Sequence, residues 1–203
     1  MRLLLVPALA AVAAAQSPRI ISFSGYQWTV KNSTNRVGPG PNFFSDSTAN
    51  VWVDGQGQLH LKIAKRQGKW YCAEIVSVDS FGYGTYRFSI NSRVDNIDPN
   101  AVLGLFTWND LPDYNHREID VEFARWGSAA NQNAQYVVQP YTNPLNIFRF
   151  NWPADVPSAH SFTWSPSNVH FESQGATGAV LQQRTITSDV PQPGGENARM
   201  NLW

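Results

Sequence analysis

Apolar and polar residues alternate with a period of two along much of the chain. In residues 85–90, Tyr86, Phe88 and Ile90 fall on one face, and polar side chains fall between them. Such alternation is typical of a β-strand that buries one of its faces. No segment after residue 16 sustains the 3.6-residue period of an amphipathic helix. The pattern therefore predicts an all-β fold, an antiparallel β-sandwich or barrel.

Three further segments extend this prediction. Residues 58–63 alternate and follow a glycine-rich turn, so we expect a strand there. Residues 160–164 and 169–171 flank a turn that contains Pro166, which predicts a hairpin. Residues 101–108 form an almost continuous apolar run, which predicts a central strand that is covered on both faces.

Length and composition narrow the class of protein. The chain has 203 residues, which fits a single domain with a sizeable core. Its 15 Lys and Arg residues balance its 15 Asp and Glu residues without any long run of like charge, so no nucleic-acid partner is indicated. The chain contains 8 Trp residues, whose flat faces suit both a protein core and a sugar ring. The lone Cys72 predicts a buried, inert thiol.

The N-terminus has the pattern of an export signal. A positively charged start is followed by an apolar stretch and by Ala13–Ala15, a small-residue cleavage site. We therefore expect residues 1–15 to be a signal peptide and residues 16–203 to form the secreted, extracellular domain. The apolar stretch is too short to span a bilayer, so no membrane association is expected after cleavage. Asn32 begins an Asn-Ser-Thr sequon for N-glycosylation.

Residues 118–123 alternate strictly between acidic and apolar side chains. In a strand, Glu118, Asp120 and Glu122 project from one face, and the apolar residues between them enter the core. Neighbours on one face lie about 7 Å apart, close enough for their charges to repel each other and to raise the pKa of one carboxyl group. The sequence therefore predicts a face lined by three carboxylates.

Such a face suits glycoside hydrolysis, which needs one ionised carboxylate at C1 and one protonated carboxyl at the leaving oxygen. Glu118 and Glu122 fit these two roles, with Asp120 as a hydrogen-bonding neighbour. A solvent-exposed strand with alternating acids is the structural alternative. A Ca²⁺ site is another, although the loops rich in Asp, Asn and Gly that usually complete such a site are not adjacent. The pattern alone leaves retaining and inverting hydrolysis open.

The motif Glu-Ile-Asp-Val-Glu-Phe at residues 118–123 resembles the active-site strand of glycoside hydrolase family 16, the lichenase and laminarinase group. The signature of that family in its unbulged form is E-[I/L]-D-[I/V]-E, and further segments that resemble the family occur in the family's order. Together these segments cover nearly all of the mature chain. They lie at residues 23–28, 54–61, 81–88, 160–166 and 200–203.

The resemblance implies a concanavalin A-like jelly roll, whose concave sheet forms an open sugar cleft. It also implies a retaining endo-hydrolase that cuts a β-1,3/1,4-glucan-type polysaccharide through a covalent glycosyl-enzyme. Carried over position by position, Glu118 matches the family's nucleophile, Asp120 its assisting carboxylate and Glu122 its general acid/base. We expect no metal or other cofactor, no partner besides the polysaccharide, and a monomer.

Two tryptophans and a histidine near the motif are candidates for substrate binding. Trp108 and Trp126 flank the motif, where each either stacks on a sugar ring or fills the core. His116 shares the face of Glu118 if the strand alternation extends back to it.

Gln139 and Tyr141 are further substrate-binding candidates. They end a strand-like segment, residues 134–141, and their side chains carry groups that hydrogen-bond sugar hydroxyls.

The chain departs from the family pattern at its end, because family members run on past the Asn-Leu-Trp stretch at residues 201–203 into a last strand. We therefore expect the C-terminal strand to be missing and an unpaired sheet edge to remain.

Three other functions are considered for the same residues. One is a transglycosylase, which passes the glycosyl group to another sugar instead of to water. The second is a non-catalytic carbohydrate-binding protein on the same fold. The third is a structural surface protein, against which the three intact carboxylates argue.

Overall fold

The computed structural model describes residues 17–203, and the predicted signal peptide, residues 1–15, lies outside the described residues. Strands make up the regular structure, and among the described residues the single helical element is the short 3-10 turn η1 (Asn115–Arg117). The predicted all-β class is confirmed. No helix within residues 17–203 is long and apolar enough to cross a membrane.

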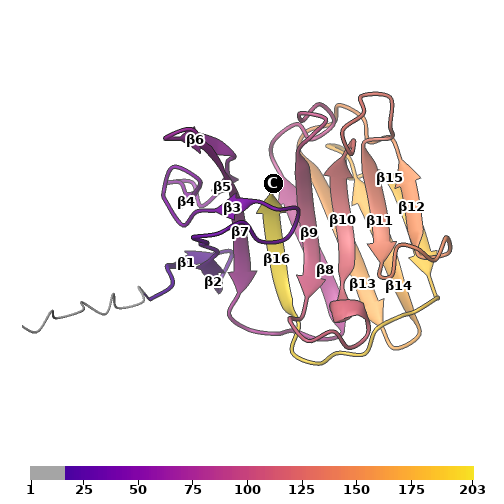
Figure 1. Ribbon diagram of the computed structural model, residues 1–203. Coiled ribbons are helices and arrows are strands. Elements are labelled where there is room, and N and C mark those ends of the chain that lie inside the picture. The colour runs from indigo at the N-terminus through magenta and orange to yellow at the C-terminus, as the bar shows by residue number, and fades with distance from the viewer. Residues whose placement is uncertain (1–16) are drawn as a thin grey trace, which may run out of the picture.

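A ten-stranded sheet forms the front layer of the molecule (Figure 1). Its main path runs in the order β1-β2-β7-β16-β9-β10-β11-β12, and β3 and β6 pair with β7. All of these pairs are antiparallel except β3 with β7. The strands are β1 (Ile20–Phe23), β2 (Tyr26–Val30), β3 (Phe43–Phe44), β6 (Ala64–Arg66), β7 (Lys69–Ser77), β9 (Val102–Trp108), β10 (Ile119–Ala124), β11 (Ala134–Val138), β12 (Ile147–Phe150) and β16 (Asn197–Leu202).

A second sheet of four strands, in the order β15-β14-β13-β8, lies behind β9 to β12 (Figure 1). Its strands are β8 (Gly84–Ile90), β13 (Ser158–Ser165), β14 (Asn168–Gln174) and β15 (Val180–Ile186). A separate pair is formed by β4 (Val51–Val53) and β5 (Leu59–Leu61). The molecule is therefore a two-layer antiparallel sandwich with a small hairpin at one side.

The core lies between the two sheets, and aromatic side chains from both sheets fill it. Tyr136 of β11 stacks on Phe171 of β14, with ring centroids 4.8 Å apart, and Phe123 of β10 meets His160 of β13 at the same separation. Tyr136 and His160 are both 0% exposed, and each hydrogen-bonds the hydroxyl group of Ser173. Burial lowers the pKa of His160 to about 3, so its ring is neutral. The side chains of Tyr136, His160 and Ser173 therefore satisfy one another's hydrogen bonds at the sheet interface.

Most of the expected strands and the expected buried thiol are confirmed. Residues 85–90 lie in β8, and its inward side chains Tyr86 and Phe88 are buried. The predicted hairpin is formed by β13 and β14, and the strand expected at residues 58–63 is present as the shorter β5. Cys72 is buried, and this burial raises the pKa of its thiol to about 11.

Two strand predictions are wrong in detail. Strand β9 is central as expected, but it is not covered on both faces, because Phe106 and Trp108 on its outer face line a cleft. Strand β11 ends at Val138 rather than at residue 141, because Pro140 has no N–H with which to continue the ladder. Apolar residues in β9 therefore mark a cleft wall as well as the core.

The strand nearest the end of the chain, β16, lies inside the sheet and pairs with β7 on one side and with β9 on the other. The unpaired edge that was expected from a missing final strand is therefore not at β16. A strand after Trp203 stays a prediction.

Phe123 tests the assignment of the apolar face of β10 to the core. We expect Phe123→Ala to lower the free energy of unfolding by about 3–5 kcal/mol, because an aromatic ring that is 0% exposed leaves a cavity when it is removed. Urea unfolding measures the loss. Phe81→Ala is the control, since Phe81 is 40% exposed and its removal creates little cavity. An equal loss of stability in both variants contradicts the assignment.

Candidate active site

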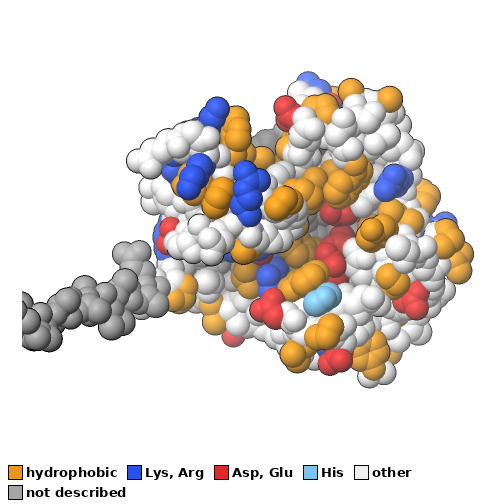
Figure 2. Space-filling view, in the orientation of Figure 1, with side chains coloured by type: hydrophobic (Ala, Val, Ile, Leu, Met, Phe, Trp, Pro, Cys, Tyr) orange, Lys and Arg blue, Asp and Glu red, His pale blue; other side chains and the backbone are white. Residues whose placement is uncertain are grey.

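Strand β10 places the acidic residues of the motif on the floor of a cleft. Glu118, directly before the strand, and Asp120 and Glu122 within it line this cleft, which has a volume of about 1060 Å³. Acidic side chains are visible at the bottom of the hollow in the space-filling view (Figure 2). The apolar residues between them are each 0% exposed: Ile119, Val121 and Phe123. The shared face that the alternation predicts is therefore confirmed.

A tight turn before β10 fixes the position of Glu118. The φ angles of residues 114–117 are all positive, between 51° and 63°, which is a left-handed course that no strand follows. Arg117 is buried and holds this turn, because its Nε donates to the Gln192 carbonyl at 2.9 Å and its own carbonyl accepts from Thr107 Oγ1 at 2.8 Å. Gly194 allows this packing, since an added Cβ there would clash with the guanidinium group of Arg117. Extended backbone begins at Glu118.

Glu118 and Asp120 form a hydrogen-bonded, poorly solvated pair. Burial, followed by repulsion from Glu118 and Glu122, raises the pKa of Asp120 well above its usual value. Burial and the charge of Glu122 raise the pKa of Glu118 to about 8, although a hydrogen bond with Asp120 and the charge of Arg199 act in the opposite direction. Gln139 Nε2 donates a long hydrogen bond, 3.5 Å, to Asp120 Oδ2. The pair therefore holds a proton at a pH where exposed carboxyl groups have lost theirs.

Glu122 has a different environment, on the side of β11 and β12. Burial raises its pKa to about 7, while a hydrogen bond from Gln135 and the charge of Arg149 lower it. Gln135 Nε2 donates to Glu122 Oε2 at 2.5 Å, and Gln135 Oε1 accepts from Arg149 Nε at 3.1 Å. A large fraction of Glu122 is therefore protonated near neutral pH, which a general acid requires.

The pKa values do not by themselves separate a nucleophile from an acid. The pKa of Glu118, about 8, is higher than that of Glu122, about 7, whereas the roles carried over from the motif require Glu118 to lose its proton first. Assignment of the two roles therefore rests on the motif. The geometry supplies two carboxyl groups in one cleft that both titrate near neutral pH.

Paired residues of six neighbouring strands form one row across the sheet, which we call the Glu122 row; its β7 to β10 part lines the cleft. From β7 to β12 the row consists of Glu74, Asn201, Gly104, Glu122, Gln135 and Arg149. Gly104 makes room for Asn201, whose Oδ1 accepts the Gly104 N–H at 3.1 Å and lies 2.6 Å from the position of an added Cβ. The cleft floor beside Glu122 therefore has no side chain at Gly104 and presents the polar side chain of Asn201.

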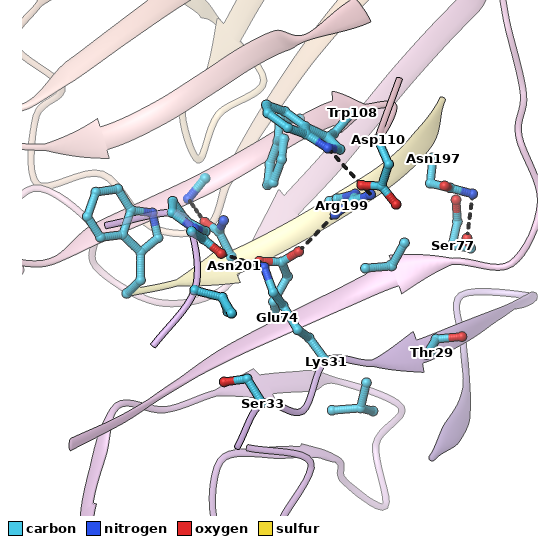
Figure 3. A pocket seen from close by; sticks show the side chains of 18 of the residues that line it. Thr29, Lys31, Ser33, Glu74, Ser77, Trp108, Asp110, Asn197, Arg199 and Asn201 are labelled. Atoms are coloured by element: carbon cyan, nitrogen blue, oxygen red, sulfur yellow. Dashed lines mark hydrogen bonds and ion pairs between the residues drawn. The ribbon is translucent and has the colours of Figure 1, made fainter. Parts of the chain in front are cut away.

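A chain of ion pairs extends the polar floor toward β2 and β7 (Figure 3). Glu74 is 1% exposed and pairs with Lys31 Nζ at 2.8 Å and with Arg199 Nη1 at 3.4 Å. Arg199 Nη2 also lies 3.2 Å from Asp110, which accepts from Trp108 Nε1 at 3.0 Å. The buried carboxylate of Glu74 is thus compensated by two cations, as a desolvated charge requires.

The structure brings Trp108 into the cleft but not His116. The ring of Trp108 lines the cleft and stacks on the ring of His116, with centroids 4.1 Å apart and planes at 6°. His116 lies in the left-handed turn rather than in β10, and its Nδ1 hydrogen-bonds the Asn109 carbonyl at 2.9 Å. The strand alternation does not extend back to His116, so the expectation that it shares the face of Glu118 is wrong.

The other three candidates surround the site at different distances. Gln139 contacts Asp120 directly. Trp126 is 39% exposed and packs against Trp203, which lines the cleft, with ring centroids 6.2 Å apart. Tyr141 is 62% exposed, and its backbone N–H donates to Gln139 Oε1 at 2.8 Å. Contacts of these three side chains with a sugar stay predictions.

Sequence reasoning missed the residues that surround the acidic trio from other strands. Glu74 had a local signal, because it is the only charged residue in the apolar run 70–76. The other residues had no local signal, since their place beside the acidic trio depends on pairing between strands that are far apart in sequence. The missed residues are Lys31, Glu74, Gln135, Arg149, Arg199 and Asn201.

Within residues 17–203, no group of three or more His, Cys, Asp or Glu side chains is arranged to hold a metal ion. The geometry of the trio thus lends no support to the Ca²⁺ interpretation.

Comparison with known proteins finds sequence and structural similarity to proteins named beta-glucanase. No family model matches the chain. Its sequence is 26% identical over 157 residues to the beta-glucanase of Bacillus licheniformis, a match that covers 76% of this chain and 60% of that protein. The chain thus spans less than two thirds of the length of this curated relative.

Solved structures share the fold. A Bacillus licheniformis beta-glucanase structure matches with a TM-score of 0.65 and 21% identity, over 90% of this chain and 81% of that chain. A Mycobacterium tuberculosis protein described as an immunostimulatory antigen and pseudo β-1,3-glucanase matches with a TM-score of 0.63 and 19% identity, over 86% and 79% of the two chains.

These likenesses establish the architecture. The chain adopts the antiparallel jelly-roll fold of the lichenases, and its sequence is similar to that of a bacterial protein named beta-glucanase. Membership in glycoside hydrolase family 16 stays a prediction from the motif.

Proposed function

We propose that this protein is a retaining endo-β-glucanase of glycoside hydrolase family 16 that hydrolyses a β-1,3/1,4-glucan-type polysaccharide. The observation that carries the proposal is the placement of Glu118, Asp120 and Glu122 together on the floor of one cleft. The raised pKa values of the two glutamates and the similarity to a protein named beta-glucanase support it.

The reaction proceeds in two displacements. In the first, a carboxylate oxygen of Glu118 bonds to the anomeric carbon while the bond from that carbon to the glycosidic oxygen breaks, and Glu122 gives its proton to the departing oxygen. In the second, Glu122 takes a proton from water while the water oxygen bonds to the anomeric carbon and the bond to Glu118 breaks. Both carboxyl groups return to their starting states, and the anomeric configuration is retained.

The neighbours of the two glutamates suit these steps. Asp120 shares a hydrogen bond with Glu118, which holds the nucleophile in one orientation and stabilises its charge. Gln135 donates to Glu122, so one oxygen of that carboxyl group is fixed and the other is directed away from Gln135. Each role thus has its own support within hydrogen-bonding distance.

The cleft suits a long chain that is cut internally. The Glu122 row crosses the sheet from β7 to β12, which gives a path on both sides of the acidic trio. Phe106, Trp108 and Trp203 line the cleft and offer apolar surface to sugar rings, while the polar row offers partners for hydroxyl groups.

We also propose that the protein acts outside the cell as a monomer, after removal of residues 1–15, and that it needs neither a metal nor another cofactor. The export pattern at the N-terminus and the balanced charge support this setting, in which the polysaccharide is the partner rather than a nucleic acid or a membrane.

A non-catalytic glucan-binding protein is the second candidate. It is favoured by one observation, the similarity in fold to a protein described as a pseudo β-1,3-glucanase. A transglycosylase uses the same carboxylates and the same covalent intermediate, but the acceptor is a sugar hydroxyl instead of water.

Substitution of the two glutamates tests the proposed chemistry. We expect Glu118→Gln and Glu122→Gln each to lower kcat on lichenan or laminarin by about a thousandfold or more, because each removes a group that reacts with the substrate. Release of reducing ends is the measurement. Sodium azide should restore part of the activity of Glu118→Ala, since the small anion takes the place of the lost carboxylate.

Glu172→Gln is the matched control, because Glu172 of β14 lies on the second sheet. It should retain wild-type activity. If the wild-type protein binds glucans but releases no reducing ends from lichenan, laminarin, xyloglucan or agarose, the non-catalytic function replaces the proposed one.

An added oligosaccharide acceptor separates hydrolysis from transfer. We expect the products from lichenan to be shortened glucans with or without the acceptor, as judged by chromatography and mass spectrometry. A new product that contains the acceptor identifies a transglycosylase instead.

The raised pKa values also predict how stability depends on pH. Glu118 and Glu122 bind protons more tightly in the folded protein, with pKa values of about 8 and about 7, than in the unfolded chain, where the value is 4.5. Between the unfolded pKa of 4.5 and the folded pKa values of about 8 and about 7, the folded state holds more protons than the unfolded state. The free energy of unfolding therefore falls as pH rises through this window. Above the folded pKa values, the free energy of unfolding does not fall further on account of these two groups.

We therefore expect Glu118→Gln to raise Tm by a few degrees at about pH 9 and to leave Tm unchanged at about pH 4, where the wild-type carboxyl group is already neutral. Calorimetry at the two pH values measures the difference, with Glu172→Gln as the control. An equal rise in Tm at both pH values means that the side chain acts through packing and not through its charge.

A further inference from the structure

Arg149 of β12 lies next to Gln135 in the Glu122 row, on the side of the acidic trio that faces away from Arg199. It is exposed, and its Nε donates to Gln135 Oε1 at 3.1 Å. Gln135 itself is buried, 6% exposed, and donates to Glu122 at 2.5 Å. The register places the three residues directly opposite one another on β10, β11 and β12.

The direction of each hydrogen bond in this relay is set by chemistry. A guanidinium group only donates hydrogen bonds, and a side-chain amide accepts with its oxygen and donates with its nitrogen. Once Arg149 occupies the oxygen of Gln135, the amide nitrogen must point toward Glu122. Without Arg149, the amide is free to turn its oxygen toward Glu122, which suits the protonated carboxyl group and not the ionised one.

We infer that Arg149 is a positioning residue for the proton transfer of Glu122: it locks the amide of Gln135 as a donor and supplies a fixed positive charge on the β12 side of the cleft. This role rests on the proposed function. It concerns the step in which Glu122 changes from acid to carboxylate, because both the donor and the charge stabilise the ionised form.

Other charged groups also face Glu122, and the effect of Arg149 on its ionisation has to be compared with theirs. On its own strand lie Asp120 and, just before the strand, Glu118, and both oppose ionisation of Glu122. Across β9 lies the ion chain of Arg199, Glu74 and Lys31, in which the cations are already paired with carboxylates. Arg149 has no ion-pair partner among residues 17–203, so its charge is not cancelled by a neighbouring carboxylate in the same way.

The chain contains a matched control for this relay. On the second sheet, Arg87 Nη2 donates to Gln174 Oε1 at 2.9 Å, and Gln174 Nε2 donates to Glu172 Oε1 at 2.6 Å. This is the same Arg–Gln–Glu sequence of donors and acceptors, and Arg87 is exposed like Arg149. It lies outside the cleft, so it reports the effect of losing such an arginine where no acidic trio is present.

The test compares Arg149→Met, Arg149→Lys and Arg87→Met. In Arg149→Met we expect the alkaline limb of the pH profile of kcat/KM to move upward by on the order of 0.5 pH unit, because the acid holds its proton more tightly when a nearby charge is lost. Arg149→Lys, which keeps the charge, should restore part of the shift. Arg87→Met should leave the profile unchanged.

A second readout does not depend on activity. Titration of the Glu122 carboxyl group in the free protein, followed by NMR of ¹³C-labelled glutamate and assigned with Glu122→Gln, should show the same upward shift in Arg149→Met. If the wild-type protein is inactive on every glucan, the proposed function fails while this titration still tests the relay. An unchanged Glu122 midpoint in Arg149→Met, or an equal shift in Arg87→Met, overturns the inference.

Discussion

Burial of one face of β10 is the constraint on which the site depends. The apolar side chains of this strand are completely removed from solvent, so the strand cannot rotate or slip by one residue without exposing them: Ile119, Val121 and Phe123. The period of two then forces Glu118, Asp120 and Glu122 onto the opposite face. The hydrophobic core therefore positions the carboxylates, and the turn held by Arg117 sets where the strand begins.

Three acids on one poorly solvated face repel one another, and the surrounding strands limit this cost. On one side Arg199 is tied to Glu74 and Asp110, so its charge acts on Glu118 from a fixed position. On the other side Gln135 donates to Glu122. The pKa values of the two glutamates rise to about 8 and about 7, because burial outweighs these compensations. The raised pKa values thus lower the free energy of unfolding at neutral pH, and they leave carboxyl groups in the site that hold protons there.

Local sequence predicted what local geometry determines. Alternation in β8 and β10 correctly indicated strands and the face of each side chain, and the acidic trio followed from it. The prediction for His116 was wrong, because the left-handed turn before β10 breaks the alternation. This turn contains no glycine that would have indicated positive φ angles in the sequence. The apolar run of β9 was misread as buried on both faces, since Phe106 and Trp108, which line the cleft, are as apolar as core residues. The places of Gln135 and Asn201 beside the trio could not be predicted from local sequence, because the register between distant strands depends on the whole sheet.

Hydrogen bonds alone do not mark the site, since an Arg–Gln–Glu relay occurs on both sheets. Around Glu172 the neighbours on the same face of β14 are His170 and Gln174, neither of them a carboxylate. Around Glu122 the neighbours on the same strand are acids, and the cleft excludes part of the solvent that would screen them. The same local chemistry is therefore a surface contact in one place and a means of controlling a proton in the other. Convergence of like charges in a concave, partly dry space makes the difference.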